Sequence, residues 1–328
     1  MKYYLQLSTK LICFLLLNFC CSGLSAQVTF TSYHKKNGDE TKQRDSAYFM
    51  RMIQVEEKNK DKAFRIEEFY LHNDSVKLNG VSKNALPPYK FQGRKYEFHE
   101  NGTLKSLENF NDGSLRDSAF YLYPNNKLEK IIFYPSSLGK KGKLKIEKPI
   151  YVVYYDSLRN KTLENGNGTI RLNYDYGRGY EEGEMKNSLR EGEWKGRSGK
   201  DSFIETYKND KVISGVKTKE NGEVIPYDAT NFMRRPEYPG GISRLMGFIA
   251  SHYNYARTAI DNNVKGIVEI EFTVDKEGEP KDMIVKKDLG FGTGEEGLRV
   301  LKKAGKWKPG IQRGENVNVR YTIPIRLN

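Results

Sequence analysis

Residues that could catalyse a reaction or bind a metal ion are few in this chain of 328 residues. No Gly-X-Ser-X-Gly motif is present to place a serine nucleophile on a sharp turn. Adjacent carboxylates such as Glu181 and Glu182 are common features of a solvated surface. The four histidines lie in separate segments without the spacing of metal ligands, at His34, His72, His99 and His252. We therefore expect no metal, no cofactor, no small-molecule substrate and no catalytic residue, and so not an enzyme.

The segment Gly290–Gly294 is the part of the chain most similar to an anion-binding loop, because it is rich in glycine and precedes a predicted helix. It lacks the Gly-Lys-Ser/Thr end of a phosphate-binding loop and the third glycine of a dinucleotide fingerprint. We interpret it as a loop-to-helix turn. Thr293 and Glu296 have the spacing of a capping box, which predicts the start of that helix.

The first 26 residues have the pattern of a secretory signal. Lys2 and Lys10 precede the apolar run Leu11 to Leu17, and the small residues Ser22, Gly23, Ser25 and Ala26 end the segment. The apolar run is shorter than the roughly 20 residues that span a bilayer. We predict a cleaved signal over residues 1–26 and a periplasmic protein. The alternative is an inner-membrane anchor formed by residues 11–26.

All three cysteines, Cys13, Cys20 and Cys21, lie within this segment. A mature chain that starts at Gln27 would have no disulfide, no thiolate metal site and no cysteine nucleophile. Cys20 could also suggest a lipoprotein, but bulky Phe19 stands where lipid attachment requires a small residue.

The formal net charge of the whole chain is +13. A basic protein is a candidate for nucleic-acid binding. However, acidic residues alternate with the basic ones throughout, no block of Arg and Lys appears, and the predicted location is outside the cytoplasm. We therefore expect no nucleic-acid partner and a solvated surface that attracts anionic polymers or lipids of the envelope.

Residues 27–228 are predicted to form antiparallel β-hairpins. Short alternating runs are separated by Asn-Gly, Asn-Asn or Asn-Asp pairs, which favour tight turns. The pattern recurs at intervals of roughly 20 residues, which indicates repeats. Expected strands and turns include 47–55, 64–71 and 150–155, with hairpins around Asn125-Asn126 and Asn209-Asp210. The many tyrosines could stack on sugars or bases, but tyrosine also suits a half-buried pleated surface, the interpretation that we favour.

The clearest copy of this unit is Glu184–Lys195, which contains Arg190-Glu191-Gly192-Glu193-Trp194-Lys195. This segment resembles the repeats of the MORN type that also occur in the YwqK family. The resemblance implies a meandering antiparallel sheet with one packed face and one solvated face, which serves as a scaffold or a binding surface.

Residues 229–241 are rich in Pro and Gly and are predicted to link two domains. In residues 242–328, Ile242, Leu245, Met246 and Ile249 recur at helical spacing. Residues 267–274 alternate as a half-buried strand, 275–279 form a turn, and 283–287 return as its partner. A second helix follows Thr293. Trp307 is expected to fill the space between helix and sheet.

The last strand is expected over residues 317–327, with Pro324 as its most informative residue. Proline has no N–H, so a central strand would lose a hydrogen bond there, and this strand should lie at a sheet edge. Backbone groups of alternate residues point to the same side. The residues expected to present their backbones to the free edge are Asn318, Arg320, Thr322 and Arg326. Such an edge can accept a partner strand, or its proline and arginines can prevent aggregation.

Residues 236–327 resemble the C-terminal domain of TonB proteins in an ordered series of short segments. The matching segments are Tyr238-Pro239-Gly240-Gly241, Tyr255 with Ala259, Gly266, Asp275-Lys276-Glu277-Gly278, Trp307-Lys308-Pro309-Gly310 and Tyr321-Thr322-Ile323-Pro324-Ile325. The resemblance implies an α+β fold with a three-stranded antiparallel sheet and two helices. Its structural residues here would be Tyr255, Gly266, Trp307, Pro309 and Pro324.

This resemblance also implies a function. Members of the TonB family bind a short motif of outer-membrane receptors by strand pairing along the last strand. Full transducers have an inner-membrane anchor and a long Pro-rich spacer, whereas a hairpin region occupies that place here. We therefore expect docking to an outer-membrane TonB-dependent receptor in support of energised transport. The alternative is an envelope adaptor whose repeats bind a polymer or protein and whose C-terminal domain forms a homodimer.

Overall fold

The computed structural model of the protein describes residues 29–58, 61–138, 144–174 and 178–327. The predicted signal and the alternative membrane anchor, residues 1–26, lie outside this part. Among the described residues, no helix is both long enough and apolar enough to cross a membrane.

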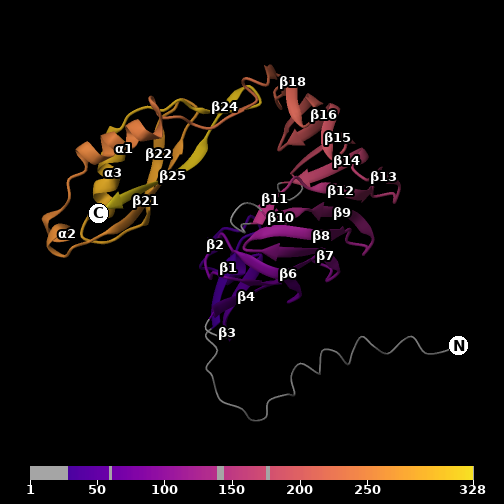
Figure 1. Ribbon diagram of the computed structural model, residues 1–328, viewed down its shortest axis with the longest axis horizontal. Helices are drawn as coiled ribbons and strands as arrows, with labels where there is room; N and C mark the ends of the chain where they lie inside the picture. The colour runs from indigo at the N-terminus through magenta and orange to yellow at the C-terminus, as the bar shows by residue number, and fades with distance from the viewer. Residues whose placement is uncertain (1–28, 59–60, 139–143, 175–177, 328) are drawn as a thin grey trace, which may run out of the picture. The chain divides into compact units, whose positions relative to one another are not determined.

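The fold is mostly antiparallel β-structure, as predicted, and most of its described strands belong to two series of β-hairpins. The chain forms two compact units. Figure 1 labels the helices and strands. The first unit contains the described parts of residues 1–128 and 136–146, and the second contains residues 129–135 and the described parts of 147–328.

The first unit is a series of β-hairpins. β1 (Thr29–His34) pairs with β2 and β3, and each strand from β3 to β7 pairs with the next one. The other strands are β2 (Glu40–Thr41), β3 (Phe49–Lys58), β4 (Asp61–Tyr70), β5 (Val76–Ser82), β6 (Phe91–Phe98), β7 (Leu104–Asn111) and β8 (Ser114–Leu122), with a short separate pair of β10 (Ser136–Leu138) and β11 (Leu144–Ile146) and a 3-10 turn over Arg44–Ser46.

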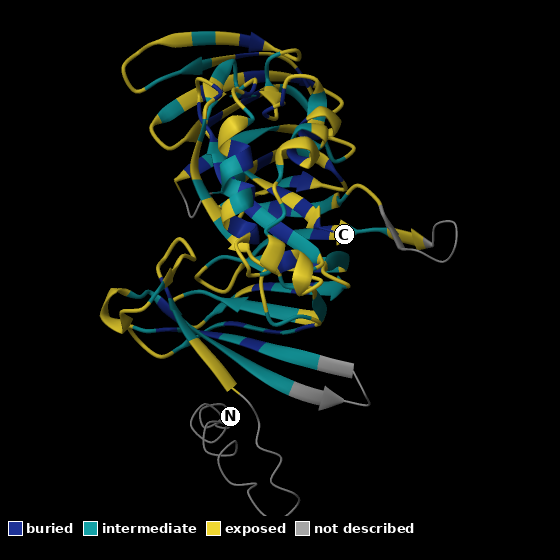
Figure 2. Ribbon diagram, turned by 90° about the vertical axis from the view of Figure 1, so that its left-hand side faces the viewer, coloured by how far each residue is buried: buried dark blue, intermediate teal, exposed yellow. Residues whose placement is uncertain are grey.

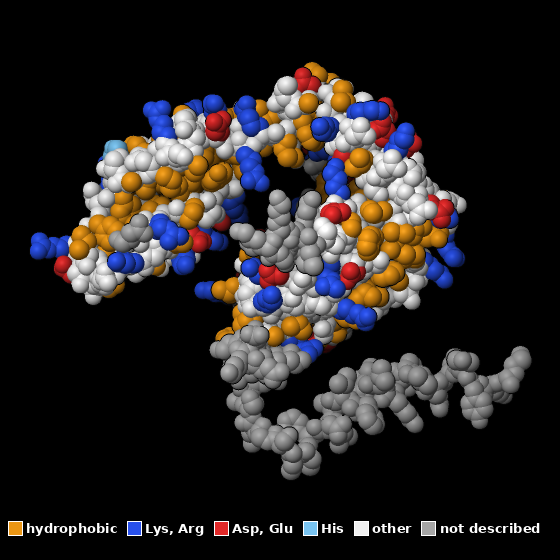
Figure 3. Space-filling view, viewed as in Figure 1, with side chains coloured by type: hydrophobic (Ala, Val, Ile, Leu, Met, Phe, Trp, Pro, Cys, Tyr) orange, Lys and Arg blue, Asp and Glu red, His pale blue; other side chains and the backbone are white. Residues whose placement is uncertain are grey.

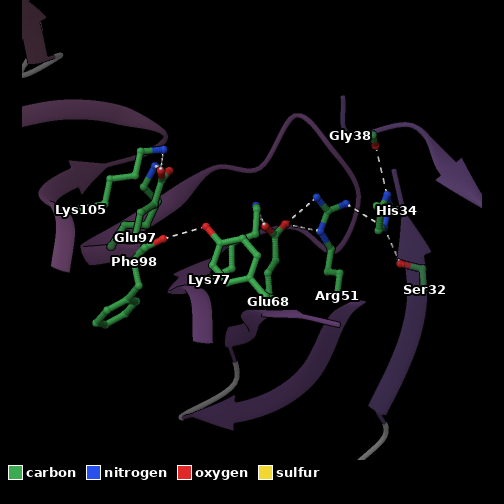
Figure 4. Close-up of polar contacts among 11 residues, drawn as sticks. Ser32, His34, Gly38, Arg51, Glu68, Lys77, Glu97, Phe98 and Lys105 are labelled. Carbon is green, nitrogen blue, oxygen red and sulfur yellow. Dashed lines mark hydrogen bonds and ion pairs between the residues drawn. The ribbon is translucent and has the colours of Figure 1, made fainter. Parts of the chain in front are cut away.

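One face of this first sheet carries polar and charged side chains that are buried. Arg51 donates from Nε and Nη2 to Oε1 of Glu68, at 2.8 and 2.6 Å. Lys77 contacts the other oxygen of Glu68. Figure 4 shows the guanidinium of Arg51 between Glu68 and the ring of His34, which is itself stacked on Phe49. Because buried charges are costly unless they are paired, this network fixes how the strands pack.

The second unit begins with another series of hairpins. β9 pairs with β12, and each strand from β12 to β18 pairs with the next. Their bounds are β9 (Leu128–Tyr134), β12 (Ile150–Tyr155), β13 (Lys161–Glu164), β14 (Asn167–Tyr174), β15 (Gly179–Lys186), β16 (Leu189–Ser198), β17 (Asp201–Lys208), β18 (Lys211–Thr218) and β19 (Val224–Asp228).

The turns of this region have the backbone geometry of the tight hairpins that the sequence pattern predicted. Asn187 and Ser188 between β15 and β16 both have positive φ, as do Asn209 and Asp210 between β17 and β18. A two-residue turn with both φ angles positive matches the twist of the flanking strands. Trp194 on β16 is fully buried, and its ring lies where a side chain on Gly183 would be. The antiparallel repeats are therefore as expected, while the MORN-type identity remains a resemblance.

The C-terminal part of the second unit is an α+β domain. Its main sheet has the order β22-β21-β25, and a second small sheet has the order β20-β23-β24. The elements are β20 (Met233–Arg234), α1 (Gly241–His252), α2 (Arg257–Asp261), β21 (Gly266–Val274), β22 (Pro280–Lys287), α3 (Thr293–Lys303), β23 (Gly310–Gln312), β24 (Glu315–Val317) and β25 (Val319–Leu327). The three-stranded sheet is as predicted. A separate short α2 and the small sheet add to the two helices that we expected.

The helices α1 and α3 pack on the main sheet through apolar side chains. Figure 2 colours the buried residues of the chain dark blue. Leu245 and Ile249 of α1 and Val300 and Leu301 of α3 are buried with the inward side chains of the sheet. The predicted capping box at α3 is wrong, since Thr293 is the first helical residue. Asp288 performs that role instead, because its Oδ1 accepts hydrogen bonds from Gly294 N and from the hydroxyl of Thr293.

Candidate functional site: the edge strand β25

β25 lies at the edge of the main sheet. It pairs with β21 in an unbroken antiparallel register, from Gly266 opposite Leu327 to Val274 opposite Val319. Within the described residues, no strand pairs with its other side. The predicted edge position of the last strand is therefore what the structure shows.

Pro324 fixes which backbone groups face the free edge. It lies opposite Glu269 in the register, and it has no N–H to give to β21. The ladder with β21 therefore uses the odd-numbered residues of β25, because N–H and C=O groups alternate between the two sides of an antiparallel strand. The backbone groups of Arg320, Thr322 and Arg326 then point to the open side.

The side chains of β25 also alternate between odd-numbered and even-numbered residues. Ile323, Ile325 and Leu327 are buried in the core beneath the helices. Arg320, Thr322, Pro324 and Arg326 are exposed. The Arg320 side chain is 76% exposed, and its only ion pair among the described residues is a long one of 3.8 Å to Glu271. The outer surface of the edge therefore offers two cations beside unpaired backbone groups.

Asn318 differs from the other residues predicted for this edge. It lies between β24 and β25, before the first residue of the strand. Its side-chain carbonyl accepts a hydrogen bond from the backbone N–H of Lys276, at 3.1 Å. This contact ties the start of β25 to the turn between β21 and β22.

The TonB resemblance predicted a set of structural residues, and these residues support the sheet. The hydroxyl of Tyr255 donates to the carbonyl of Val264 at 2.7 Å. Gly266 begins β21 with a φ of 146°, and Leu289 packs where a side chain would be. Trp307 is buried, with its ring centroid 5.2 Å from that of Tyr321 and 5.5 Å from that of Phe272.

Pro309 and the segment predicted as a linker also belong to this arrangement. Pro309 is half-buried and lies between Lys308 and β23. Lys308 forms an isolated β-bridge with Glu237. Residues 229–241 contain β20, which pairs with β23, and Tyr238, whose ring packs edge-on against Trp307. The hydroxyl of Tyr238 donates to the carbonyl of Ala304 at 2.8 Å. Part of the predicted linker therefore contributes directly to the C-terminal core.

Sequence reasoning missed the hairpin β23–β24 and its contacts with the repeat sheet. Its turn residue Arg313 donates from Nε to Oε1 of Glu205 on β17, at 2.6 Å. The Glu205 side chain is fully buried, and the hydroxyls of Tyr207 and Tyr227 also donate to it. The guanidinium of Arg313 lies 3.6 Å from the ring centroid of Phe203. Both oxygens of this buried carboxylate are thus satisfied.

The same hairpin makes a second ionic contact with β18. Glu315 lies 2.6 Å from the ammonium of Lys217 and 2.7 Å from that of Lys219. Hydrogen bonds from these two lysines lower the pKa of Glu315 to about 2. No local sequence pattern pairs residues about 100 positions apart, so only the Arg313-Gly314 turn signal was available to suggest the hairpin.

The described residues contain no group of three or more His, Cys, Asp or Glu side chains arranged to hold a metal ion. Figure 3 shows Lys and Arg side chains spread over the visible face of the C-terminal domain among apolar ones, without a single cationic block.

The chemistry of this site is therefore that of a basic, exposed strand edge on a small α+β domain. Residues 251–328 match the family model for the Gram-negative bacterial TonB protein C-terminal region. A comparison with curated proteins gave no match. The chain thus carries a TonB C-terminal domain over these residues, and this domain indicates a TonB-like function in the cell envelope.

Proposed function

We propose that this protein is a non-catalytic, periplasmic binding protein that docks onto outer-membrane TonB-dependent receptors in support of energised transport. The observation that supports this proposal most directly is the free edge of β25 within a TonB C-terminal domain. A receptor segment would add a strand there, with main-chain hydrogen bonds providing affinity and side-chain contacts providing specificity. Arg320 and Arg326 would favour a receptor segment with acidic residues.

Self-association through the same edge is the alternative that we consider less favourable. Two copies of β25 overlap fully only when their antiparallel register is centred on Ile323. That register places Arg320 of one copy opposite Arg326 of the other, and like charges directly opposite each other are destabilising. It also places Pro324, which lacks an N–H, opposite Thr322. A receptor strand has neither restriction.

The first test replaces Thr322 with proline. Thr322→Pro removes one N–H from the free side of β25 and leaves the ladder with β21 intact. With synthetic peptides copied from the N-termini of the source bacterium's TonB-dependent receptors, we expect affinity to fall about fivefold to tenfold, the value of one backbone hydrogen bond. Isothermal titration calorimetry measures the affinity, and circular dichroism checks the fold.

Two control variants separate docking from folding. Thr322→Val changes the side chain and keeps the N–H, so peptide affinity should change little. Ile323→Pro removes an N–H from the β21 side and should unfold the domain. If folded Thr322→Pro binds the peptides as well as the unchanged protein does, docking along β25 is wrong.

A further inference from the structure

The outer face of the repeat sheet from β15 to β19 carries an apolar strip that is exposed to solvent. The other face buries Trp194, Phe203 and Tyr207. An antiparallel sheet with one solvated face normally has polar residues on that face. Here Ile204 is 52% exposed and Val216 is 39% exposed, and they lie directly opposite each other on β17 and β18. Pro226 on β19 extends the strip, because it lies opposite Val216.

Basic and aromatic side chains lie on the same face, on the neighbouring strands β16 and β15. Lys195 lies opposite Ile204, and Arg197 lies opposite both Ser202 on β17 and Tyr180 on β15. A hollow of about 280 Å³ on this face is lined by these residues and by Ile204 and Val216 of the apolar strip. The hollow therefore has an apolar half at Ile204 and Val216 and a cationic half at Lys195 and Arg197, separated by about one strand spacing of 4.8 Å.

The cations of this hollow are weakly paired. Lys195 lies 3.4 Å from Glu182, which is shared with Arg171, and its side chain is 63% exposed. Arg197 has no ion pair within the part of the chain that the structure describes. Exposed pairs of this kind contribute little stability, so both cations can bind another carboxylate at small cost.

We propose that this hollow binds an acidic and apolar peptide segment of a partner protein. An apolar side chain of the segment packs on Ile204 and Val216, while a carboxylate one or two residues away pairs with Arg197 and Lys195. The net charge of +13 opposes a second copy of this chain and favours an acidic partner. A concave surface accepts a protruding side chain better than it inserts into a bilayer. This proposal does not depend on the function of β25.

The test uses the full chain and defined peptides. One pool contains capped hexapeptides of Gly and Ser with one Leu and one Asp, separated by one to three residues, and the matched pool has Asn in place of Asp. We expect the Asp pool to contain binders that the Asn pool lacks, as measured on peptide arrays and by titration calorimetry. Vesicles with 30% phosphatidylglycerol test whether a lipid surface is the ligand instead.

Variants of the hollow locate the binding. The pair Lys195→Gln and Arg197→Gln, and separately Ile204→Ser, should each weaken the best peptide about tenfold. The matched pair Lys186→Gln and Lys211→Gln removes the same charge outside the hollow and should leave affinity unchanged. The proposal is wrong if the two pools bind equally, if both pairs of variants have equal effects, or if only vesicle binding responds to the variants.

Discussion

His34 is a buried side chain whose surroundings disfavour its charged form. Its Nε2 lies 2.8 Å from the hydroxyl of Ser32 and 3.4 Å from the guanidinium of Arg51, while Nδ1 lies 3.1 Å from the carbonyl of Gly38. Nδ1 therefore carries the proton of a neutral ring. Burial first, and then the charge of Arg51, lower the pKa of His34 below its ordinary value of 6.5. The hydrogen bond to Gly38 and then the charges of Glu68 and Glu40 oppose this effect without reversing it.

The lowered pKa of His34 predicts a loss of stability in acid. Its neutral ring stabilises the fold fully above pH 6.5, and this contribution disappears as the pH falls through the folded pKa. Proton NMR of the ring should give a pKa below 6.5. Urea unfolding should show a stability loss that begins as the pH falls below 6.5 and that is smaller in His34→Gln. An equal pH dependence in His34→Gln would assign the effect to other groups.

At the scale of elements, the turn between β21 and β22 depends on Gly278. Its φ is 87°, and a Cβ atom there would overlap the carbonyl oxygen of Trp307. The backbone N–H of Trp307 donates to the carbonyl of Gly278 at 2.8 Å. The turn therefore holds the segment that inserts Trp307 into the core.

This close approach predicts a large effect of Gly278→Ala. Gly305 is the matched control, because it has a φ of 83° in the same domain and open space where a Cβ would be. Gly305→Ala should cost about 1–2 kcal/mol of unfolding free energy for the positive φ alone. Gly278→Ala should cost about 2 kcal/mol more, because of the overlap. Denaturant unfolding measures both, and equal costs would mean that Trp307 moves away freely.

The elements also show what the sequence can predict and what it cannot. Hairpins at Asn187-Ser188 and Asn209-Asp210 were predictable because the turn chemistry is local. The edge position of β25 was predictable because Pro324 cannot donate a hydrogen bond. The cap of α3 was not, because Asp288 lies outside the capping-box spacing and acts across a loop. Asn318 was placed in β25 because alternation alone does not reveal the break after β24.

At the scale of the whole molecule, the second unit is held together by contacts that link its repeats to its C-terminal domain. The chief one is the ion pair of Arg313 with buried Glu205. Burial first, and then the hydrogen bond to Glu205, raise the pKa of Tyr227. Tyr227 therefore stays protonated and continues to donate to the carboxylate.

Removal of Arg313 should be costly for this reason. Arg313→Ala leaves the charge of Glu205 buried and without its cation, which should lower the unfolding free energy by about 3–5 kcal/mol. Denaturant unfolding and hydrogen exchange of the β23–β24 hairpin measure the effect. Lys308→Ala, which breaks an exposed pair with Glu237, should cost about 1 kcal/mol or less.

A second variant tests the cause. Adding Glu205→Gln to Arg313→Ala should recover part of the loss, because the amide carries no charge, its carbonyl can accept from one tyrosine hydroxyl, and its NH2 can donate to the hydroxyl oxygen of the other. If it recovers nothing, packing of Arg313 on Phe203 accounts for the effect, and the charge does not.

The position of Tyr238 also determines where the chain can be divided for laboratory work. The Pro- and Gly-rich stretch before α1 suggests a cut at residue 242. A fragment that begins there would lack the Tyr238 ring that packs against Trp307 and the β20 strand that pairs with β23. A fragment from residue 229 keeps both, but its β23–β24 hairpin lacks the repeat strands that it contacts. Adding the strands from β17 onward retains Glu205 and gives the shortest piece in which Arg313 keeps its counterion.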